Sequence, residues 1–310
     1  TLMDLDTFLT TVYVMIDDYC KAQGMNWMKS TGPKPSLTLS EVLSLVVLSR
    51  WHRFSSDRDF YRFADQHLRA AFPNLPAYSQ FNRLMRAIGN SLNSFNQFLV
   101  VSMQVQACVY EALDTMGCAT RNAKRRGEGW LAGEANIGYS NRLGWYEGLN
   151  VMTSVTPDGF ISGFGCAPAS TKEQRYADTF FALRATGSRD LPEVGRPAQG
   201  TYITDNGFCG KSNRQRWQQW YSVQVITPPQ RSHSNSWSKA LRRWLSGLRQ
   251  IVETVHEKLL NSFRLDRERP HLLQGFRVRL AASVTLHNFC IWLNIQLGRP
   301  KLAFADLIVW

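Results

Sequence analysis

The sequence predicts a mixed α/β fold, in which a helical N-terminal domain precedes a central mixed sheet of five strands flanked by helices. Apolar residues recur at helical spacing over the first hundred residues. Near residue 108 the pattern changes to short β-rich runs, and after residue 170 strand-like and helix-like segments alternate. Strands in direct succession, followed by such alternation, favour one sheet with helices packed on its faces.

The N-terminal domain is predicted over residues 1–105 as a series of short helices. The spacing of apolar residues places the first helix between about residues 2 and 24. Thr38 and Glu41 fit a capping box, because a Thr at the N-cap and a Glu three residues later each accept a hydrogen bond from a free backbone N–H group. The box opens a second helix that includes residues 42–50.

Two further helices are predicted in this domain. One begins at Ser55 or Ser56 and ends at His67, and the other is capped by Ser79. Short basic helices joined by tight turns are typical of a helix-turn-helix-like domain that binds DNA. A helical bundle with a solvated basic face has the same features, so the sequence leaves both interpretations open.

Residues 106–310 form the second predicted domain, which opens with three strands. The first, residues 109–114, ends on a carboxylate. The second and third, residues 146–155 and 160–164, form a hairpin around a Pro-Asp-Gly turn, since Pro presets φ and Gly accepts a positive φ.

The rest of the second domain alternates between helix and strand. The pattern predicts, in order, a helix over 173–184, a strand over 201–205 that ends on a second carboxylate, a helix over 211–221, a strand over 222–227 and a long helix over 236–263. More helix follows at the C-terminal end.

The charge balance favours a polyanionic partner. The 310 residues include 36 Lys and Arg against 24 Asp and Glu, which gives a net charge of +12. A strong positive balance is typical of proteins that bind nucleic acid or an anionic membrane surface. The hydrophobic share of 44% and the aromatic share of 12% exclude wholesale disorder.

We expect neither a signal peptide nor a membrane-spanning helix. Asp4 and Asp6 stand where a signal peptide needs basic residues, and the longest uncharged stretch, residues 281–297, is too polar and too short to span a bilayer. The six cysteines are scattered without metal-ligand spacing, which predicts free thiols in a reducing compartment. The sequence therefore predicts a cytoplasmic protein.

Acidic residues are the main candidates for chemistry, because the sequence holds no nucleophile motif, no phosphate-binding glycine loop and no zinc-ligand pair. His287 lies in an apolar stretch and is predicted to be a hydrogen-bonded core residue. Asp114 and Asp205 end two strands that can lie side by side, which brings both carboxylates to one edge of the sheet. Glu253 lies beside the apolar face of the long helix and would be the third acid.

Three converging acids in basic surroundings can hold two divalent cations. Mg²⁺ and Mn²⁺ prefer carboxylate oxygens, and two ions about 3.5–4 Å apart clamp the attacking and leaving oxygens of a phosphodiester displacement. Each acid also has an ordinary interpretation. Asp114 would be a turn residue at a strand end, Asp205 an Asx-turn residue before a glycine, and Glu253 a helix-surface acid.

The same residues carry a resemblance to the DDE transposases of bacterial insertion sequences. The resemblance covers about residues 35–295 and is closest to the insertion-sequence family numbered 982. The segments that carry it are Phe72 to Arg83, Ala112-Leu113-Asp114-Thr115, Gly138-Tyr139, Tyr146 to Asn150, Thr156 to Ile161, Pro168-Ala169-Ser170, Thr204-Asp205-Asn206-Gly207-Phe208 and Arg249 to Val255.

The resemblance implies a catalytic core like that of ribonuclease H and retroviral integrase. It implies that Asp114, Asp205 and Glu253 are the catalytic triad and bind two Mg²⁺ or Mn²⁺ ions. The implied activity is hydrolysis of phosphodiesters at the ends of an insertion sequence, followed by transfer of the freed 3′-hydroxyl into target DNA. Two alternatives stay open: a nuclease of the same fold without strand transfer, and a domesticated, non-catalytic DNA-binding protein.

The implied partner is double-stranded DNA, both the element ends and the target, and the family implies a homodimer or higher oligomer on that DNA. A bacterial cytoplasmic protein associated with the nucleoid is expected, with no membrane contact. Basic residues that adjoin the three acids in the sequence are the candidates for DNA binding: Arg121, Lys124, Arg125, Arg126, Lys211, Arg214, Arg216, Arg231, Lys239, Arg242, Arg243, Arg249 and Lys258.

Overall fold

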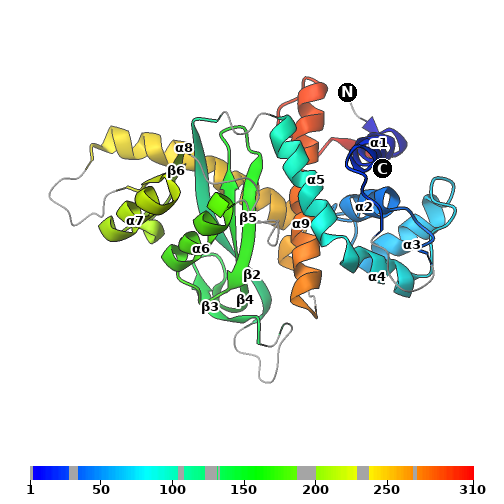
Figure 1. Ribbon diagram of the computed structural model, residues 1–310, viewed down its shortest axis with the longest axis horizontal. Coiled ribbons are helices and arrows are strands. Elements are labelled where there is room, and N and C mark those ends of the chain that lie inside the picture. The colour runs from blue at the N-terminus through cyan, green and yellow to red at the C-terminus, as the bar shows by residue number, and fades with distance from the viewer. Residues whose placement is uncertain are drawn as a thin grey trace.

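In a computed structural model, the two ends of the chain lie close together (Figure 1). Strand β1 (Met3–Asp4) near the N-terminus pairs in parallel with strand β8 (Ile308–Val309) near the C-terminus. The structure describes residues 3–27, 34–103, 108–122, 131, 133–186, 200–228, 237–267 and 271–310.

The N-terminal part of the chain is helical, as the sequence predicts. The second helix has the predicted capping box: the backbone N–H of Glu41 donates to Thr38 Oγ1 at 3.2 Å, and that of Thr38 donates to Glu41 Oε2 at 2.6 Å. The helices are α1 (Leu5–Ala22), α2 (Leu39–Leu48), α3 (Asp57–His67), α4 (Tyr78–Ala87) and α5 (Gly89–Ser102).

Ser56 caps α3, whereas the predicted Ser79 cap of α4 is wrong. Helix α4 begins at Tyr78, and its N-cap position is Ala77, which makes no side-chain cap. The ring of Tyr78 packs on Tyr61 with 5.4 Å between centroids. Ser79 is therefore already inside the helix, at an exposed position.

The central sheet confirms the predicted mixed topology. Across the sheet the order is β5, β4, β2, β6 and β7, and a short sixth strand, β3, pairs with the first half of β4. The pairs β2–β4 and β4–β5 are antiparallel, whereas β2–β6 and β6–β7 are parallel. The strands are β2 (Tyr110–Asn122), β3 (Asn136–Ser140), β4 (Gly144–Val155), β5 (Ile161–Pro168), β6 (Gly200–Ile203) and β7 (Val223–Ile226).

Helices cover both faces of the sheet (Figure 1). One face packs on α6 (Glu173–Thr186) and α7 (Lys211–Tyr221), with Leu113, Met152 and Tyr202 in that core. The other face packs on α5, α8 (Lys239–Glu257) and α9 (Leu273–Gln296). A sheet covered by helices on both faces is consistent with a ribonuclease H-like core.

The long helix and the core histidine that the sequence predicts are both present in the second half of the chain. The long predicted helix is α8 followed by a π-helical segment, Lys258–Ser262. His287 is buried, and its Nε2 lies 2.8 Å from the carbonyl oxygen of Gly159, as expected for a hydrogen-bonded core histidine. Cys20, Cys118 and Cys290 are buried free thiols. Within the described ranges no helix combines the length and the apolar character that crossing a membrane requires.

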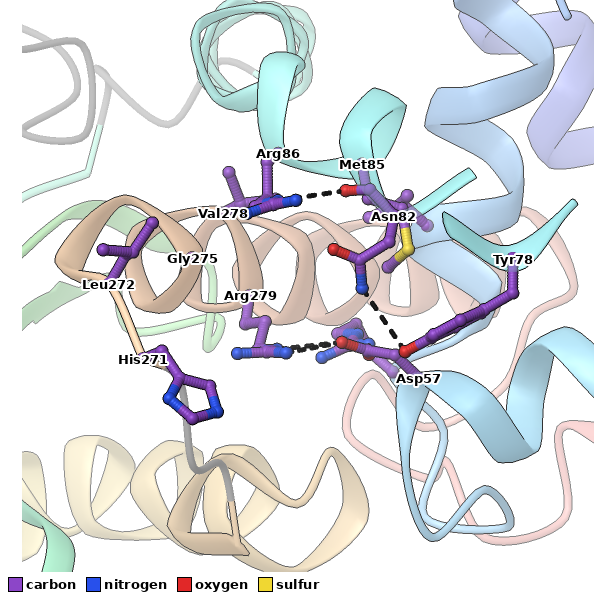
Figure 2. Close-up of a pocket in the computed structure, with 12 residues that line it drawn as sticks. Asp57, Tyr78, Asn82, Met85, Arg86, His271, Leu272, Gly275, Val278 and Arg279 are labelled. Atoms are coloured by element: carbon purple, nitrogen blue, oxygen red, sulfur yellow. Dashed lines mark hydrogen bonds and ion pairs between the residues drawn. The ribbon is translucent and has the colours of Figure 1, made fainter. Parts of the chain in front are cut away.

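The N-terminal helices join the rest of the chain through one continuous hydrophobic core, which runs from α1–α5 through α9 to the sheet. Asp57 lies in this junction and binds two arginines (Figure 2): Oδ1 accepts from Arg50, and Oδ2 accepts from Arg279 at 2.6 Å. Burial alone would raise the pKa of Asp57, but the two guanidinium groups outweigh it and hold that pKa well below its usual range.

We predict that Asp57→Ala lowers the free energy of unfolding by about 3–5 kcal/mol, because it leaves two partly or fully buried guanidinium groups without their carboxylate. Urea unfolding followed by circular dichroism measures this loss. The control is Asp65→Ala, which breaks the exposed Asp65–Arg69 pair and should cost less than about 1 kcal/mol. Equal losses in the two variants would contradict the prediction.

Candidate active site

The register of two parallel strands brings two aspartates level with each other. The β2–β6 pairing ends at Ala112 and Ile203, and Asp114 and Asp205 each follow two residues later. The predicted end of the first strand at Asp114 is wrong, because β2 continues to Asn122 along its antiparallel partner β4. Asp114 therefore lies within a strand, at the point where its parallel neighbour ends.

A buried ion pair between Arg184 and Glu111 stabilises this register. Glu111 on β2 is registered with Tyr202 on β6, and Arg184 on α6 donates to both, at 2.8 Å to the Glu111 carboxylate and 2.8 Å to the Tyr202 hydroxyl. A single side chain thus links the two strands and the helix that covers them.

Glu173 is the third acid at this edge. Carboxylate oxygens of Asp114, Glu173 and Asp205 all lie within 4.8 Å of one another. Thr115, the residue after Asp114, donates to Glu173 Oε1 at 2.7 Å and fixes that carboxylate. Glu173 opens α6, directly after the loop that leaves β5.

Gly207 lies against the carboxylate of Glu173. A Cβ atom at position 207 would overlap Glu173 Oε2, so another residue there would displace that carboxylate. The backbone N–H of Gly207 also donates to Asp205 Oδ1 at 2.8 Å. The expected Asx-type turn at Asp205 therefore exists, and it orients the carboxylate within the acidic cluster.

Glu253 reaches the same cleft from the opposite face of the sheet, but it is not part of the close cluster. Its side chain is 58% exposed, and its Oε1 accepts from Arg249 Nη2 at 2.9 Å. The same Nη2 lies 3.4 Å from Asp114 Oδ2. The guanidinium group of Arg249 therefore lies between the carboxylates of Asp114 and Glu253. Arg249 precedes Glu253 by one turn of α8.

The acids line an open cleft of about 830 Å³. Its floor holds Asp114, Glu173 and Asp205, and its α8 wall holds Arg249, Glu253 and Glu257. Exposed basic residues on the rim are Arg142, in the β3–β4 turn, and Lys172, beside Glu173. The cleft is therefore acidic at its floor and basic at its rim.

Crowding of the carboxylates changes their protonation. Burial raises the pKa of Asp114 to about 7, and the charges of Asp205 and Glu173 add to the shift although Arg249 opposes it. Burial and the charge of Asp205 also raise the pKa of Glu173. Excess negative charge in a partly buried site is the situation that a bound cation relieves.

The donor set fits a hard divalent cation. The cluster offers only carboxylate oxygens, which Mg²⁺ and Mn²⁺ prefer to nitrogen or sulfur. The nearby His256 is fully buried, and burial lowers its pKa to about 3. Its Nε2 is engaged with Thr153 Oγ1 at 2.7 Å, so this histidine is an uncharged wall residue rather than a ligand.

Among the predicted DNA-binding residues, Arg249 alone of those in the described ranges lines the cleft. Arg121 makes an ion pair with Glu147 at 2.6 Å, and Arg216 makes one with Asp178 at 2.6 Å. Lys258 lies over the ring of Phe304. Five are exposed to solvent on α7 and α8, namely Lys211, Arg214, Lys239, Arg242 and Arg243, and four lie outside the described residues, namely Lys124, Arg125, Arg126 and Arg231.

Sequence comparison identifies the family. Residues 118–289, more than half of the chain, match the model of the family described as Transposase DDE domain. The chain belongs to this family. The match includes Glu173, Asp205 and Glu253 and begins four residues after Asp114. No curated protein matches the chain.

Glu173 is the site residue that the sequence analysis missed. The predicted hairpin could have placed Glu173 in the site. Strand β5 is antiparallel to β4, and β4 is antiparallel to β2, so β5 and β2 run in the same direction. The chain therefore leaves β5 at the same edge of the sheet as Asp114, and an acid at the next helix start belongs to that edge.

We predict that Asp114→Asn stabilises the metal-free protein at pH 8, by on the order of 1–2 kcal/mol. The folded-state pKa of about 7 lies above the unfolded value, so the wild type loses stability as pH rises from about 4 to 7. The variant has no such charge. Urea unfolding in EDTA should show that Asp114→Asn raises the free energy of unfolding strongly at pH 8 and only slightly at pH 5.

The control for this experiment is Asp158→Asn, which removes an exposed carboxylate paired with Lys301. This control should not raise the free energy of unfolding at either pH. A gain for Asp114→Asn that is the same at pH 5 and pH 8 would contradict the assignment of the effect to the buried charge.

Proposed function

We propose that the protein is a DNA transposase that hydrolyses phosphodiesters at insertion-sequence ends and transfers the freed 3′-hydroxyl into target DNA. The observation that carries the proposal is the convergence of Asp114, Asp205 and Glu173 at one sheet edge, with Glu253 across the same cleft, in a member of the DDE transposase family. The family numbered 982 is the proposed subgroup.

Asp114 and Asp205 are the proposed central ligands of two Mg²⁺ or Mn²⁺ ions, with Glu253 as the third catalytic acid. Glu173 is proposed as an additional ligand, since one of its carboxylate oxygens lies within 4.8 Å of an oxygen of each aspartate. When bound, the ions would supply charge stabilisation at the attacking and leaving oxygens of the phosphodiester.

The chain's own residues orient the substrate. Arg249 Nε is buried and, within the described part of the chain, has no hydrogen-bond partner. The guanidinium group lines the cleft beside the acids, where it is suited to hold a phosphate oxygen. Lys172 and Arg142 on the rim would attract the flanking backbone, so that the duplex approaches over a basic edge towards an acidic floor.

The exposed basic residues of α7 and the first turns of α8 are proposed to contact DNA outside the cleft. The N-terminal domain, residues 1–105, is proposed as a second DNA-binding unit, and synapsis of two element ends would need a homodimer or a higher oligomer. A nucleoid-associated place in the bacterial cytoplasm follows from this partner.

We predict that Asp114→Asn, Asp205→Asn and Glu253→Gln each lower DNA cleavage by about 1,000-fold or more, because each removes a charge that the transition state needs. Glu173→Gln should raise the Mg²⁺ concentration needed for half-maximal cleavage by about 10- to 100-fold. Cleavage of labelled DNA, followed while Mg²⁺ is titrated from zero, measures both effects. In gel-shift assays the DNA affinity of the variants should equal that of the wild type.

Glu257→Gln is the matched control, since Glu257 lines the same cleft one turn beyond Glu253 on α8 and is exposed. Its cleavage rate should stay within about twofold of the wild type. Full cleavage by Asp114→Asn, Asp205→Asn or Glu253→Gln would remove that residue from the catalytic set.

We predict that a labelled element end incubated with the protein, Mg²⁺ and a supercoiled plasmid yields joined products. The freed 3′-hydroxyl attacks target DNA by the same in-line route as water, so cleavage and joining share one site. Cleavage without joining would favour the nuclease alternative. Metal-independent binding with no cleavage of any DNA would favour the domesticated, non-catalytic alternative.

A further inference from the structure

A second pocket lies away from the acidic cleft, between the N-terminal helices and α9 (Figure 2). Helices α2, α3 and α4 form one side, and α9 with the two residues before it forms the other. Its volume is about 320 Å³. A water molecule occupies about 30 Å³ of the liquid, so the pocket has room for a phosphate group and part of its sugar.

The lining of this pocket carries an excess of positive charge. It includes three arginines, Arg50, Arg86 and Arg279, but a single acid, Asp57. Both oxygens of Asp57 are already engaged, one by Arg50 and the other by Arg279. Arg50 and Arg279 together carry one positive charge more than Asp57 neutralises, and Arg86 adds another to the lining.

Two of the three arginines are held in place by Asp57. The Arg50 side chain is 1% exposed and that of Arg279 is 21% exposed, and Asp57 fixes both. Arg86 is exposed, and its Nε donates to the Asn82 carbonyl oxygen at 3.3 Å (Figure 2). Fixed donors lose little conformational freedom when an anion binds, which favours binding.

Neutral groups complete the lining. Asn82 Nδ2 lies 3.3 Å from the Tyr78 hydroxyl, so one amide and one phenol stand together in the pocket. Met85 and Val278 supply apolar contact. Hydrogen-bond donors beside an apolar wall suit a phosphate with its attached sugar better than a free inorganic anion.

We propose that this pocket binds a phosphodiester group of the DNA backbone and so anchors DNA at the junction between the N-terminal helices and α9. The proposal rests on DNA being the partner under the proposed function, but not on catalysis. The exposed Arg86 supplies the contact, and the Arg50–Asp57–Arg279 cluster supplies a positive field beside it. A phosphate contact of this kind contributes affinity and register without reading base sequence.

The test compares Arg86→Ala with Arg83→Ala in the full chain. Both arginines are exposed on α4, but Arg83 lies outside the pocket lining. Neither change touches the buried Asp57 cluster, so both variants should fold, and circular dichroism checks this. Fluorescence anisotropy with a labelled duplex gives the dissociation constant at several salt concentrations.

We predict that Arg86→Ala weakens DNA binding by about tenfold at low salt and reduces the slope of log affinity against log salt by about 0.9, the value for one lost phosphate contact. Arg83→Ala should leave the slope unchanged. Equal slopes in the two variants, whether both fall or neither does, would overturn the pocket as a specific phosphate site.

A second measurement separates DNA from a free ligand. Thermal unfolding is followed with inorganic phosphate and with a deoxynucleoside monophosphate, since a ligand that binds the folded state raises its stability. Stabilisation by either one that Arg86→Ala abolishes, without any change in the DNA salt slope, would overturn the DNA proposal in favour of a free nucleotide or phosphate. Wild-type protein that binds no DNA would instead contradict the proposed function.

Discussion

The parallel register between β2 and β6 is the constraint on which the candidate site depends. The strands are joined over three residue pairs, which end at Ala112 and Ile203. A shift of one strand by a single residue would turn its aspartate to the other face of the sheet. The contacts of Arg184 with Glu111 and Tyr202 oppose such a shift. After a shift, the buried Arg184 could no longer bind the Glu111 carboxylate and the Tyr202 hydroxyl together.

With the register fixed, the acids arrive at the edge from both faces of the sheet. Glu173 belongs to α6, which covers one face, and Glu253 belongs to α8, which covers the other. Carboxylates from separate layers repel one another at close range, and the raised pKa of Asp114 and Glu173 expresses that repulsion together with burial. The fold therefore holds these groups where, without a cation, they are unfavourable.

The sequence predicted the sheet and the two aspartates because local signals specify them. Alternating strand and helix patterns, a Pro-Asp-Gly turn and an Asp-Asn-Gly segment each carry their structure within a few residues. It did not predict the short strand β3 or the start of α4, because these follow from contacts between distant segments. The strand directions could have placed Glu173 at this edge of the sheet, but its hydrogen bond with Thr115, 58 residues earlier in the chain, is a contact that spacing does not predict.

The two glutamates differ in how firmly they are held. Glu173 is fixed by Thr115 and by the close approach of Gly207, so its carboxylate stands ready in the cluster. Glu253 is exposed and paired only with Arg249 in the described contacts, and such a surface pair is worth about 0–1 kcal/mol. Giving up that pair costs little, so Glu253 can turn towards a cation between the aspartates while Arg249 turns towards a phosphate. A fixed ligand on one face and an adjustable one on the other suit a site that assembles when DNA and metal are both present.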